Sequence, residues 1–215
     1  ELGLSENVKI IIGAGDNAAA AIGTGAVGKC KCNISLGTSG TIFLSNDAFT
    51  VDDKNALHSF CHADGGWHLM GCILSAASCR KWWLEDILGT EDYAADELNV
   101  SKTDTDGLLF LPYLSGERSP HNDVKAKGAF IGLTTTTTRA QMSKAVMEGV
   151  AFALRDCLEV AKENGLKVDC ATLCGGGAKS KVWREIVANV LNLPMCTLET
   201  EQGPSYGAAI LAMVG

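Results

Sequence analysis

The last quarter of the chain alternates between short apolar runs and longer helical stretches, and this alternation restricts the choice of fold more than any other feature. Residues 171–174 and 195–198 have the length and apolar character of buried strands. Residues 179–191 and 205–213 follow them with the periodicity of helices. Strands that alternate with helices in this way are typical of an α/β fold.

The first part of the chain fits the same class of fold. Residues 8–12 form an apolar run that glycines end before an alanine-rich stretch at 17–22, which predicts a strand, a turn and a helix. Residues 32–36 and 41–44 are two β-rich runs on either side of a polar, glycine-flanked tip, which predicts a hairpin. We expect further strands at 57–61, 67–70, 108–111 and 129–133, and helices at 73–88, 91–99 and 139–164. Thr138 and Gln141 have the spacing of a capping box for the last of these helices.

Charge and hydropathy exclude some classes of protein. The chain has 18 Lys and Arg against 25 Asp and Glu, so the clustered positive charge that binds a nucleic-acid backbone is missing. No apolar run reaches the roughly 18 to 20 residues that span a bilayer, and no signal segment opens the chain. We therefore expect a cytoplasmic protein that binds neither nucleic acid nor membrane.

The nine cysteines favour buried, reduced thiols over disulfides, because many of them lie inside apolar runs. Cys30 and Cys32 would face the same side of a strand and pack in a core. A zinc site at His58, Cys61, His62 and His68 is the competing interpretation, but these residues lack paired Cys-x-x-Cys units. We expect no metal ligands among the residues of this chain.

Three glycine-bearing turns lie where a predicted strand gives way to a helix or to a hairpin partner. Their sequences are Gly13-Ala14-Gly15-Asp16-Asn17, Gly37-Thr38-Ser39-Gly40 and Gly175-Gly176-Gly177-Ala178-Lys179-Ser180. Backbone N–H groups, short hydroxyls and a helix N-terminus can bind phosphate at such turns. Each turn alone could equally be an ordinary connection between secondary-structure elements, and none matches the phosphate-loop or dinucleotide-binding pattern.

Asp16 is the one acidic residue that the sequence places at a strand-to-helix turn. A carboxylate there could accept the proton of a substrate hydroxyl, which suits phosphoryl transfer. The alternative is an ordinary helix N-cap.

The order of five motifs along the chain resembles that of the FGGY carbohydrate kinases. The motifs are Gly-Asp-Asn-Ala-Ala, Ser-Leu-Gly-Thr-Ser-Gly, Leu-Pro-Tyr-Leu-Ser-Gly-Glu-Arg-Ser-Pro, Gly-Gly-Gly-Ala-Lys-Ser and Gly-Pro-Ser-Tyr-Gly-Ala-Ala. Within the family, His-Ser-Phe-Cys-His followed by Trp-His-Leu-Met and Leu-Ser-Ala-Ala-Ser-Cys is most similar to the bacterial xylulose kinases. The resemblance covers nearly the whole chain.

The resemblance implies a ribonuclease-H-like fold of the actin type, with a mixed sheet flanked by helices, and a site for ATP, magnesium and a sugar. It implies that Asp16 is the catalytic base and that Asn17 touches the sugar. The roles that it implies for ATP binding fall to Gly37, Thr38, Ser39 and Gly40 at the β- and γ-phosphates and to Gly176, Gly177 and Ala178 at the adenosine. Trp82 occupies the place of an aromatic beside adenine, although core packing explains it nearly as well. Ser180 stands near the place where related kinases often carry an asparagine, so we expect only an uncertain side-chain contact there.

The resemblance also implies an organisation in domains. Residues 1–26 resemble the last strand and helix of the N-terminal sugar-binding domain, at the hinge, and residues 27–215 resemble a C-terminal ATP-binding domain that is truncated at its end. We expect the partner of this chain to be the missing N-terminal domain, we expect the chain to be inactive by itself, and a homodimer stays open. The alternatives are a kinase of gluconate, glycerol or ribulose, a non-catalytic actin-like nucleotide-binding module, and a sugar-sensing transcription factor, which the acidic charge disfavours.

Overall fold

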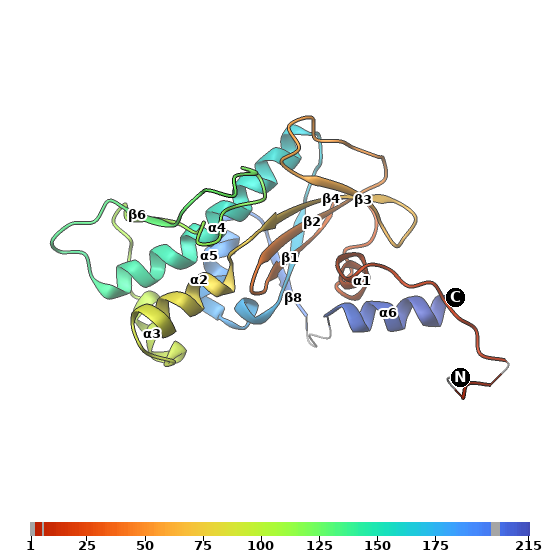
Figure 1. The fold of residues 1–215 in the computed structure, drawn as a ribbon, viewed down its shortest axis with the longest axis horizontal. Helices are drawn as coiled ribbons and strands as arrows, with labels where there is room; N and C mark the ends of the chain where they lie inside the picture. Colours follow the sequence, from red (N-terminus) through yellow and green to blue (C-terminus); the bar gives the residue numbers. More distant parts are fainter. Residues whose placement is uncertain (1–2, 6, 199–202) are drawn as a thin grey trace.

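The computed structural model describes residues 3–5, 7–198 and 203–215, and its centre is a mixed sheet of six strands (Figure 1). The strands of this sheet are β1 (Lys31–Leu36), β2 (Gly40–Asn46), β3 (His58–Cys61), β4 (Trp67–Ile73), β7 (Cys170–Cys174) and β8 (Met195–Thr197). Their spatial order is β3-β4-β2-β1-β7-β8. The first four pair antiparallel, whereas β7 and β8 run parallel to β1, so the expected mixed sheet is confirmed. A small second sheet pairs β5 (Leu109–Leu111) with β6 (Ala129–Ile131).

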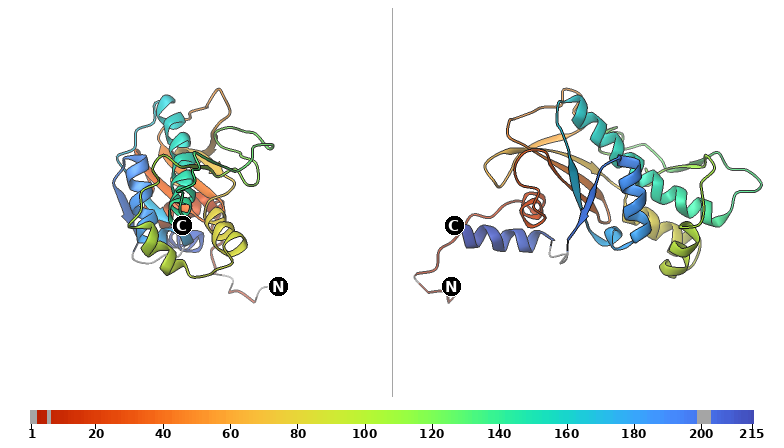
Figure 2. Two further views of the ribbon diagram at one scale, coloured as in Figure 1. Left: turned by 90° about the vertical axis from the view of Figure 1, so that its left-hand side faces the viewer. Right: turned by 180° about the vertical axis from the view of Figure 1, so that it is seen from behind.

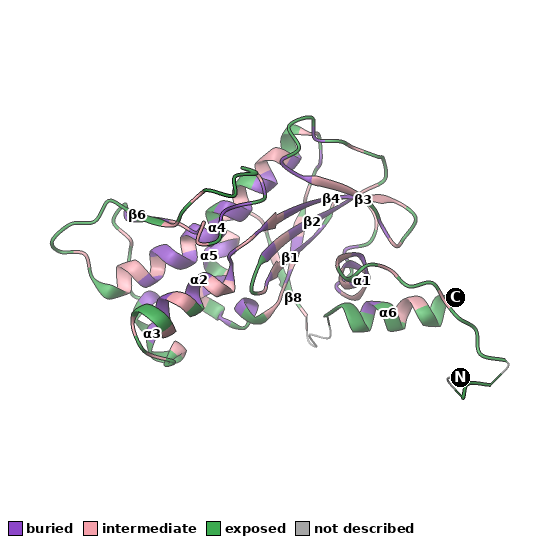
Figure 3. Ribbon diagram, viewed as in Figure 1, coloured by how far each residue is buried: buried purple, intermediate pink, exposed green. Residues whose placement is uncertain are grey.

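Helices cover both faces of the large sheet. They are α1 (Asp16–Gly23), α2 (Ala77–Lys81), the π-helical η1 (Trp82–Ile87), α3 (Tyr93–Val100), α4 (Arg139–Glu163), the 3₁₀ turn η2 (Gly176–Lys179), α5 (Lys181–Leu191) and α6 (Gly203–Val214). Neighbouring residues of β2 show the two faces, because Ile42 joins the main core beneath α4 whereas Phe43 packs with Ala21 of α1. The buried residues are concentrated along α4 and the strands, and the exposed ones at the periphery (Figure 3).

Local signals explain where several elements begin and end. The hydroxyl of Thr138 accepts a hydrogen bond from the backbone N–H of Gln141, and the Gln141 side chain accepts one from the backbone of Thr138, so the predicted capping box is confirmed. Asn192 ends α5 in the left-handed conformation, with φ of 51°.

Helices α1 and α6 lie side by side at one end of the molecule, apart from the long α4 (Figures 1 and 2). Their contact depends on Gly207, because a Cβ atom built on it would lie 1.7 Å from the carbonyl oxygen of Ala19. Gly207 is also the one buried residue of α6. The absence of a side chain at this position therefore sets how closely the two helices approach.

The structure corrects three expectations from the sequence. Residues 8–12 form no strand: no strand of the described chain lies beside them, and Ile10 and Ile12 are 88% and 94% exposed. Cys30 has a positive φ of 62° and precedes β1, so only Cys32 lies on the strand and in the core. The helix expected at 73–88 starts at Ala77, because β4 continues to Ile73, and it becomes π-helical from Trp82.

Candidate functional site

The turn between β1 and β2 is attached to the start of α2. The carbonyl oxygen of Thr38 accepts hydrogen bonds from the backbone N–H of Ala76 at 2.9 Å and from the hydroxyl of Ser78 at 2.8 Å. The carbonyl oxygen of Gly37 accepts one from the N–H of Ala77 at 2.8 Å. Thr38 and Ser39 are exposed, whereas Gly40 is buried, with space for no side chain because a Cβ atom would lie 2.7 Å from Ile73. The turn is thus fixed at its base and open at its tip.

The glycine turn after β7 lies directly against the first turn. Since β7 runs parallel to β1, both strands end at the same edge of the sheet. A Cβ atom on Gly175 or on Gly177 would lie 2.8 Å from atoms of Leu36, the residue before Gly37. Gly175 also has a φ of 89°, which a residue with a side chain would rarely adopt. The structure therefore brings together two turns that are almost 140 residues apart in sequence.

A cavity of about 380 Å³ connects these two turns. It is lined by Thr38, Ala77, Ser78, Arg80, Lys81, Tyr93, Gly176, Gly177 and Trp183. Gly176 is exposed, and a Cβ atom built on it would have no neighbour within 4 Å, so the backbone is accessible there. Ala178 and Ser180 are buried behind the turn, and the Ser180 hydroxyl caps α5 by accepting a hydrogen bond from the N–H of Trp183 at 3.1 Å.

Trp82 does not line this cavity. It lines a neighbouring one of about 410 Å³ together with Asp86, Leu114 and Ser115, and its ring lies nearly parallel to that of Phe110 at 6.2 Å between centroids. The aromatic residues that line the cavity with the glycines are Tyr93 and Trp183, which the sequence did not single out.

Asp16 is the first residue of α1, and Gly15 is its N-cap. One carboxylate oxygen of Asp16 accepts hydrogen bonds from Asn17, from the backbone N–H at 2.8 Å and from the side-chain amide at 3.3 Å. The N-cap alternative is therefore wrong in this structure, and the exposed carboxylate is oriented by its neighbour.

Asp16 and Asn17 line two cavities beside the start of α1. One, of about 360 Å³, includes Thr41 and Gly175, and the other, of about 460 Å³, includes Phe60 and His68. Gly175 lines the cavity of about 360 Å³ beside Asp16, and the next residue, Gly176, lines the cavity beside Thr38. The two cavities therefore meet at the glycine turn after β7.

The histidines near Asp16 take part in packing. His62 contacts the carbonyl oxygen of Ala26 through Nε2 at 2.9 Å, and the ring of His68 stacks on Phe43 at 4.0 Å between centroids. Burial lowers the pKa of His68 to about 4, so this imidazole is neutral near pH 7. Within residues 3–5, 7–198 and 203–215, no three His, Cys, Asp or Glu side chains form a group that could hold a metal ion. None of the helices described there combines the length and apolar composition needed to cross a bilayer.

Comparisons with known proteins identify the relatives of this chain. The model of the "FGGY family of carbohydrate kinases, C-terminal domain" matches residues 32–215. The xylulose kinase of Escherichia coli K12 is 41% identical over 211 residues, which are 96% of this chain and 43% of that protein. The xylulose kinase of Staphylococcus xylosus is 34% identical over 217 residues, which are 100% of this chain and 45% of that protein.

Two solved structures from Lactobacillus acidophilus are equally similar in fold. A ligand-bound xylulose kinase has a TM-score of 0.90 with 32% identity, and a gluconate kinase has a TM-score of 0.90 with 31% identity. Each comparison covers 98% of this chain and 44% of the solved chain. The actin-type fold expected from the sequence is confirmed, and the chain spans less than half the length of the relatives that it matches.

Proposed function

Because this chain belongs to the FGGY family of carbohydrate kinases, we propose that it is the nucleotide-binding part of an enzyme that transfers the terminal phosphate of ATP to a hydroxyl of a sugar. The observation that carries the proposal is the contact between the two glycine turns at Leu36, which opens one cavity to both Thr38 and Gly176. Exposed backbone N–H groups and hydroxyls at such turns suit the phosphates of a nucleotide.

The proposed substrate is D-xylulose and the proposed product D-xylulose 5-phosphate. Relatives named xylulose kinase cover nearly all of this chain at up to 41% identity. Similarity of fold does not separate the sugars, because a gluconate kinase is as similar in structure as a xylulose kinase. Gluconate is therefore the competing substrate.

In this proposal, Asp16 accepts the proton of the attacking hydroxyl, and Asn17 holds the carboxylate in place and contacts the sugar. Gly37, Thr38, Ser39 and Gly40 bind the β- and γ-phosphates, while Gly176, Gly177 and Ala178 lie against the nucleoside. A positioned base and fixed hydrogen-bond donors supply most of the rate in phosphoryl transfer, because the reaction depends on alignment and charge stabilisation.

Magnesium accompanies ATP in the family resemblance, and among the described residues no three His, Cys, Asp or Glu side chains lie together as a metal-binding group. Asp16 lines the two cavities beside α1 but not the one between the glycine turns, and it is the one carboxylate among the described residues that lines any of the three. We therefore assign no step to a metal ion held by these residues.

A substrate panel tests the proposed function. The full-length kinase that contains this chain is assayed for ADP production with D-xylulose, gluconate, ribulose and glycerol, and D-xylulose is expected to give the highest kcat/KM. Asp16→Asn is expected to lower kcat by at least about 100-fold while the KM for ATP stays the same. Asp53→Asn, at an exposed position, is the matched control.

Preference for gluconate would overturn the proposed sugar, and full activity of Asp16→Asn would overturn the proposed base. The chain by itself is expected to bind ATP without turnover, because it makes up less than half of a complete relative. Sugar-dependent ADP production by the chain alone would contradict this last expectation.

A further inference from the structure

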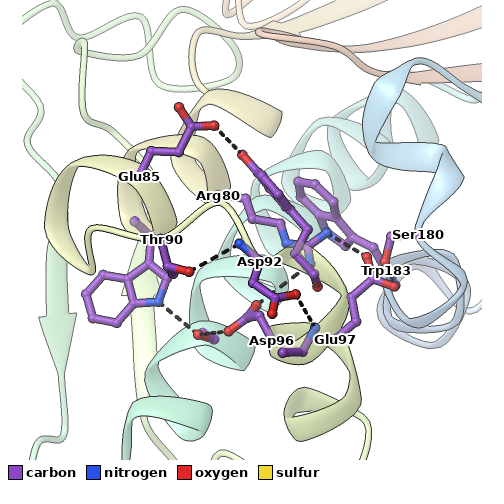
Figure 4. Close-up of polar contacts among 12 residues, drawn as sticks. Arg80, Glu85, Thr90, Asp92, Asp96, Glu97, Ser180 and Trp183 are labelled. Atoms are coloured by element: carbon purple, nitrogen blue, oxygen red, sulfur yellow. Dashed lines mark hydrogen bonds and ion pairs between the residues drawn. The ribbon is translucent and has the colours of Figure 1, made fainter.

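Arg80 in α2 lines the cavity between the glycine turns, yet its charge is directed elsewhere. Its side chain is only 7% exposed, and its guanidinium forms ion pairs with Glu97 at 2.9 Å and with Asp96 at 3.7 Å (Figure 4). It also donates a hydrogen bond to the carbonyl oxygen of Tyr93 at 3.4 Å. Two carboxylates on α3 thus balance this cation, so Arg80 does not serve as a free phosphate ligand.

The same guanidinium contacts two aromatic rings that line the cavity. Its central carbon lies 5.1 Å from the ring centroid of Tyr93 and 6.0 Å from a ring centroid of Trp183. Distances in this range are those of cation–π contacts. Arg80 therefore connects the ring of α3 with the ring of α5.

Each ring is also held at its polar atom. The hydroxyl of Tyr93 donates a hydrogen bond to Glu85 at 2.9 Å, and the indole N–H of Trp183 donates one to the carbonyl oxygen of Met147 at 3.0 Å. The acidic partner of Arg80 is fixed in the same way, since Asp96 accepts a hydrogen bond from Ser143 at 2.7 Å. These polar atoms of the cavity wall are thus paired within the protein.

The cavity has two chemically different parts. Thr38 and Ser78 supply the exposed turn and a hydroxyl, whereas the partly exposed ring of Tyr93 supplies aromatic surface, with the buried ring of Trp183 behind the cavity at 1% exposure. The accessible backbone at Gly176 lies in the lining of the same cavity. A ligand with phosphates joined to a flat heterocycle matches both parts, because a base has a π-face that stacks on aromatic side chains.

We propose that Tyr93 is the side chain that contacts the base of the bound nucleotide, and that Arg80 is a positioning residue that holds Tyr93 and Trp183 in the geometry that accepts it. This inference depends on the proposed function, which supplies the nucleotide. It assigns the base to the Tyr93 side of α2, and not to the side where Trp82 lines a separate cavity.

Steady-state kinetics of the full-length kinase test the role of Tyr93. Tyr93→Ala is expected to raise the KM for ATP about tenfold without changing kcat, while Tyr93→Phe, which keeps the ring but loses the hydrogen bond to Glu85, should raise the KM much less. Tyr206→Ala, at an exposed tyrosine of α6, is the matched control. Inorganic tripolyphosphate, which has no base, is expected to inhibit the unmodified kinase and Tyr93→Ala equally.

The outcomes separate this inference from the proposed function. An unchanged KM for ATP in Tyr93→Ala, in a kinase that is otherwise active, overturns the inference alone. A raised KM in Trp82→Leu but not in Tyr93→Ala also overturns it, because the base then lies on the other side of α2. An unmodified kinase that neither binds ATP nor phosphorylates any sugar overturns the proposed function itself.

Arg80→Lys tests the positioning role, because lysine keeps the charge but loses the planar group that contacts both rings. The expected result is a raised KM for ATP with unchanged kcat and unchanged KM for the sugar. If Arg80 only stabilised the fold, the variant would lower the active fraction, so kcat would fall while both KM values stayed constant. That second pattern overturns the positioning role.

Discussion

Replacement of Gly207 by alanine should displace the helix that carries Asp16. The new Cβ atom would lie 1.7 Å from the carbonyl oxygen of Ala19, and ordinary van der Waals contact begins at about twice that distance. The atom it meets belongs to the backbone of α1, so no side-chain rotation relieves the clash, and α1 and α6 must move apart by about 1.5 Å.

Two opposing effects set the expected loss of stability. Overpacking of a close contact costs up to about 3 kcal/mol. Alanine has a higher helix propensity than glycine, which stabilises the folded state by about 1 kcal/mol. The free energy of unfolding should therefore fall by about 2 kcal/mol, which corresponds to a shift of the urea midpoint by about 1 M.

The effect on catalysis should be larger than the effect on stability. A displacement of about 1 Å at a catalytic group can lower the rate about 100-fold, and Asp16, the base in the proposed function, is the first residue of the displaced helix. The assay is kcat for sugar phosphorylation by the full-length kinase, beside urea unfolding followed by tryptophan fluorescence. Ala208→Leu adds more volume at an exposed position of α6 and should leave both measurements unchanged. Unaltered kcat and midpoint in Gly207→Ala would refute the reasoning.

Three further predictions concern stability. Thr138→Ala should lower the free energy of unfolding by about 1 kcal/mol through loss of the capping box, and urea unfolding should show no such loss for exposed Thr135→Ala. Burial lowers the pKa of His68 to about 4. The free energy of unfolding should therefore fall by up to about 3 kcal/mol as the pH falls from 6.5 to 4. Urea unfolding of His68→Phe across this pH range should show no such fall. Burial raises the pKa of Glu117, so ionisation of this carboxyl lowers the stability of the folded state as the pH rises above 4.5. Glu117→Gln keeps an oxygen that can accept the hydrogen bond from the N–H of Leu74. This variant should be more stable than the parent at pH 7 but not at pH 4.

The parts of the fold that local sequence determines were predictable. The hairpin of β1 and β2, the capped α4 and the last two strand–helix pairs follow from periodicity, glycine turns and a capping pair. Residues 8–12 have equally good β character but no partner strand among the described residues, and a strand needs one because its backbone groups must be paired. Pairing depends on distant parts of the chain, so composition could not reveal it.

The residues of the candidate site could be proposed from the sequence only where a motif carries them. The turns at Thr38 and Gly176 could be found from glycine spacing, but Arg80 and Tyr93 have no motif and meet through tertiary packing. The direction of the Trp82 side chain could not be predicted, for a definite physical reason. From Trp82 onwards the helix is π-helical, with the N–H of Leu88 bonded to the carbonyl oxygen of Trp83, so the 3.6-residue period no longer shows which way each side chain points.

The attachment of the first glycine turn to α2 has a consequence for what the turn can recognise. The carbonyl oxygens of Gly37 and Thr38 already accept hydrogen bonds from Ala76, Ala77 and Ser78. The groups left at the tip of the turn for a ligand are mainly backbone N–H donors and the hydroxyls of Thr38 and Ser39. A surface of that polarity attracts anions and discriminates against cations. The contacts with the start of α2 that hold the turn in place therefore also make the turn selective for negatively charged ligands.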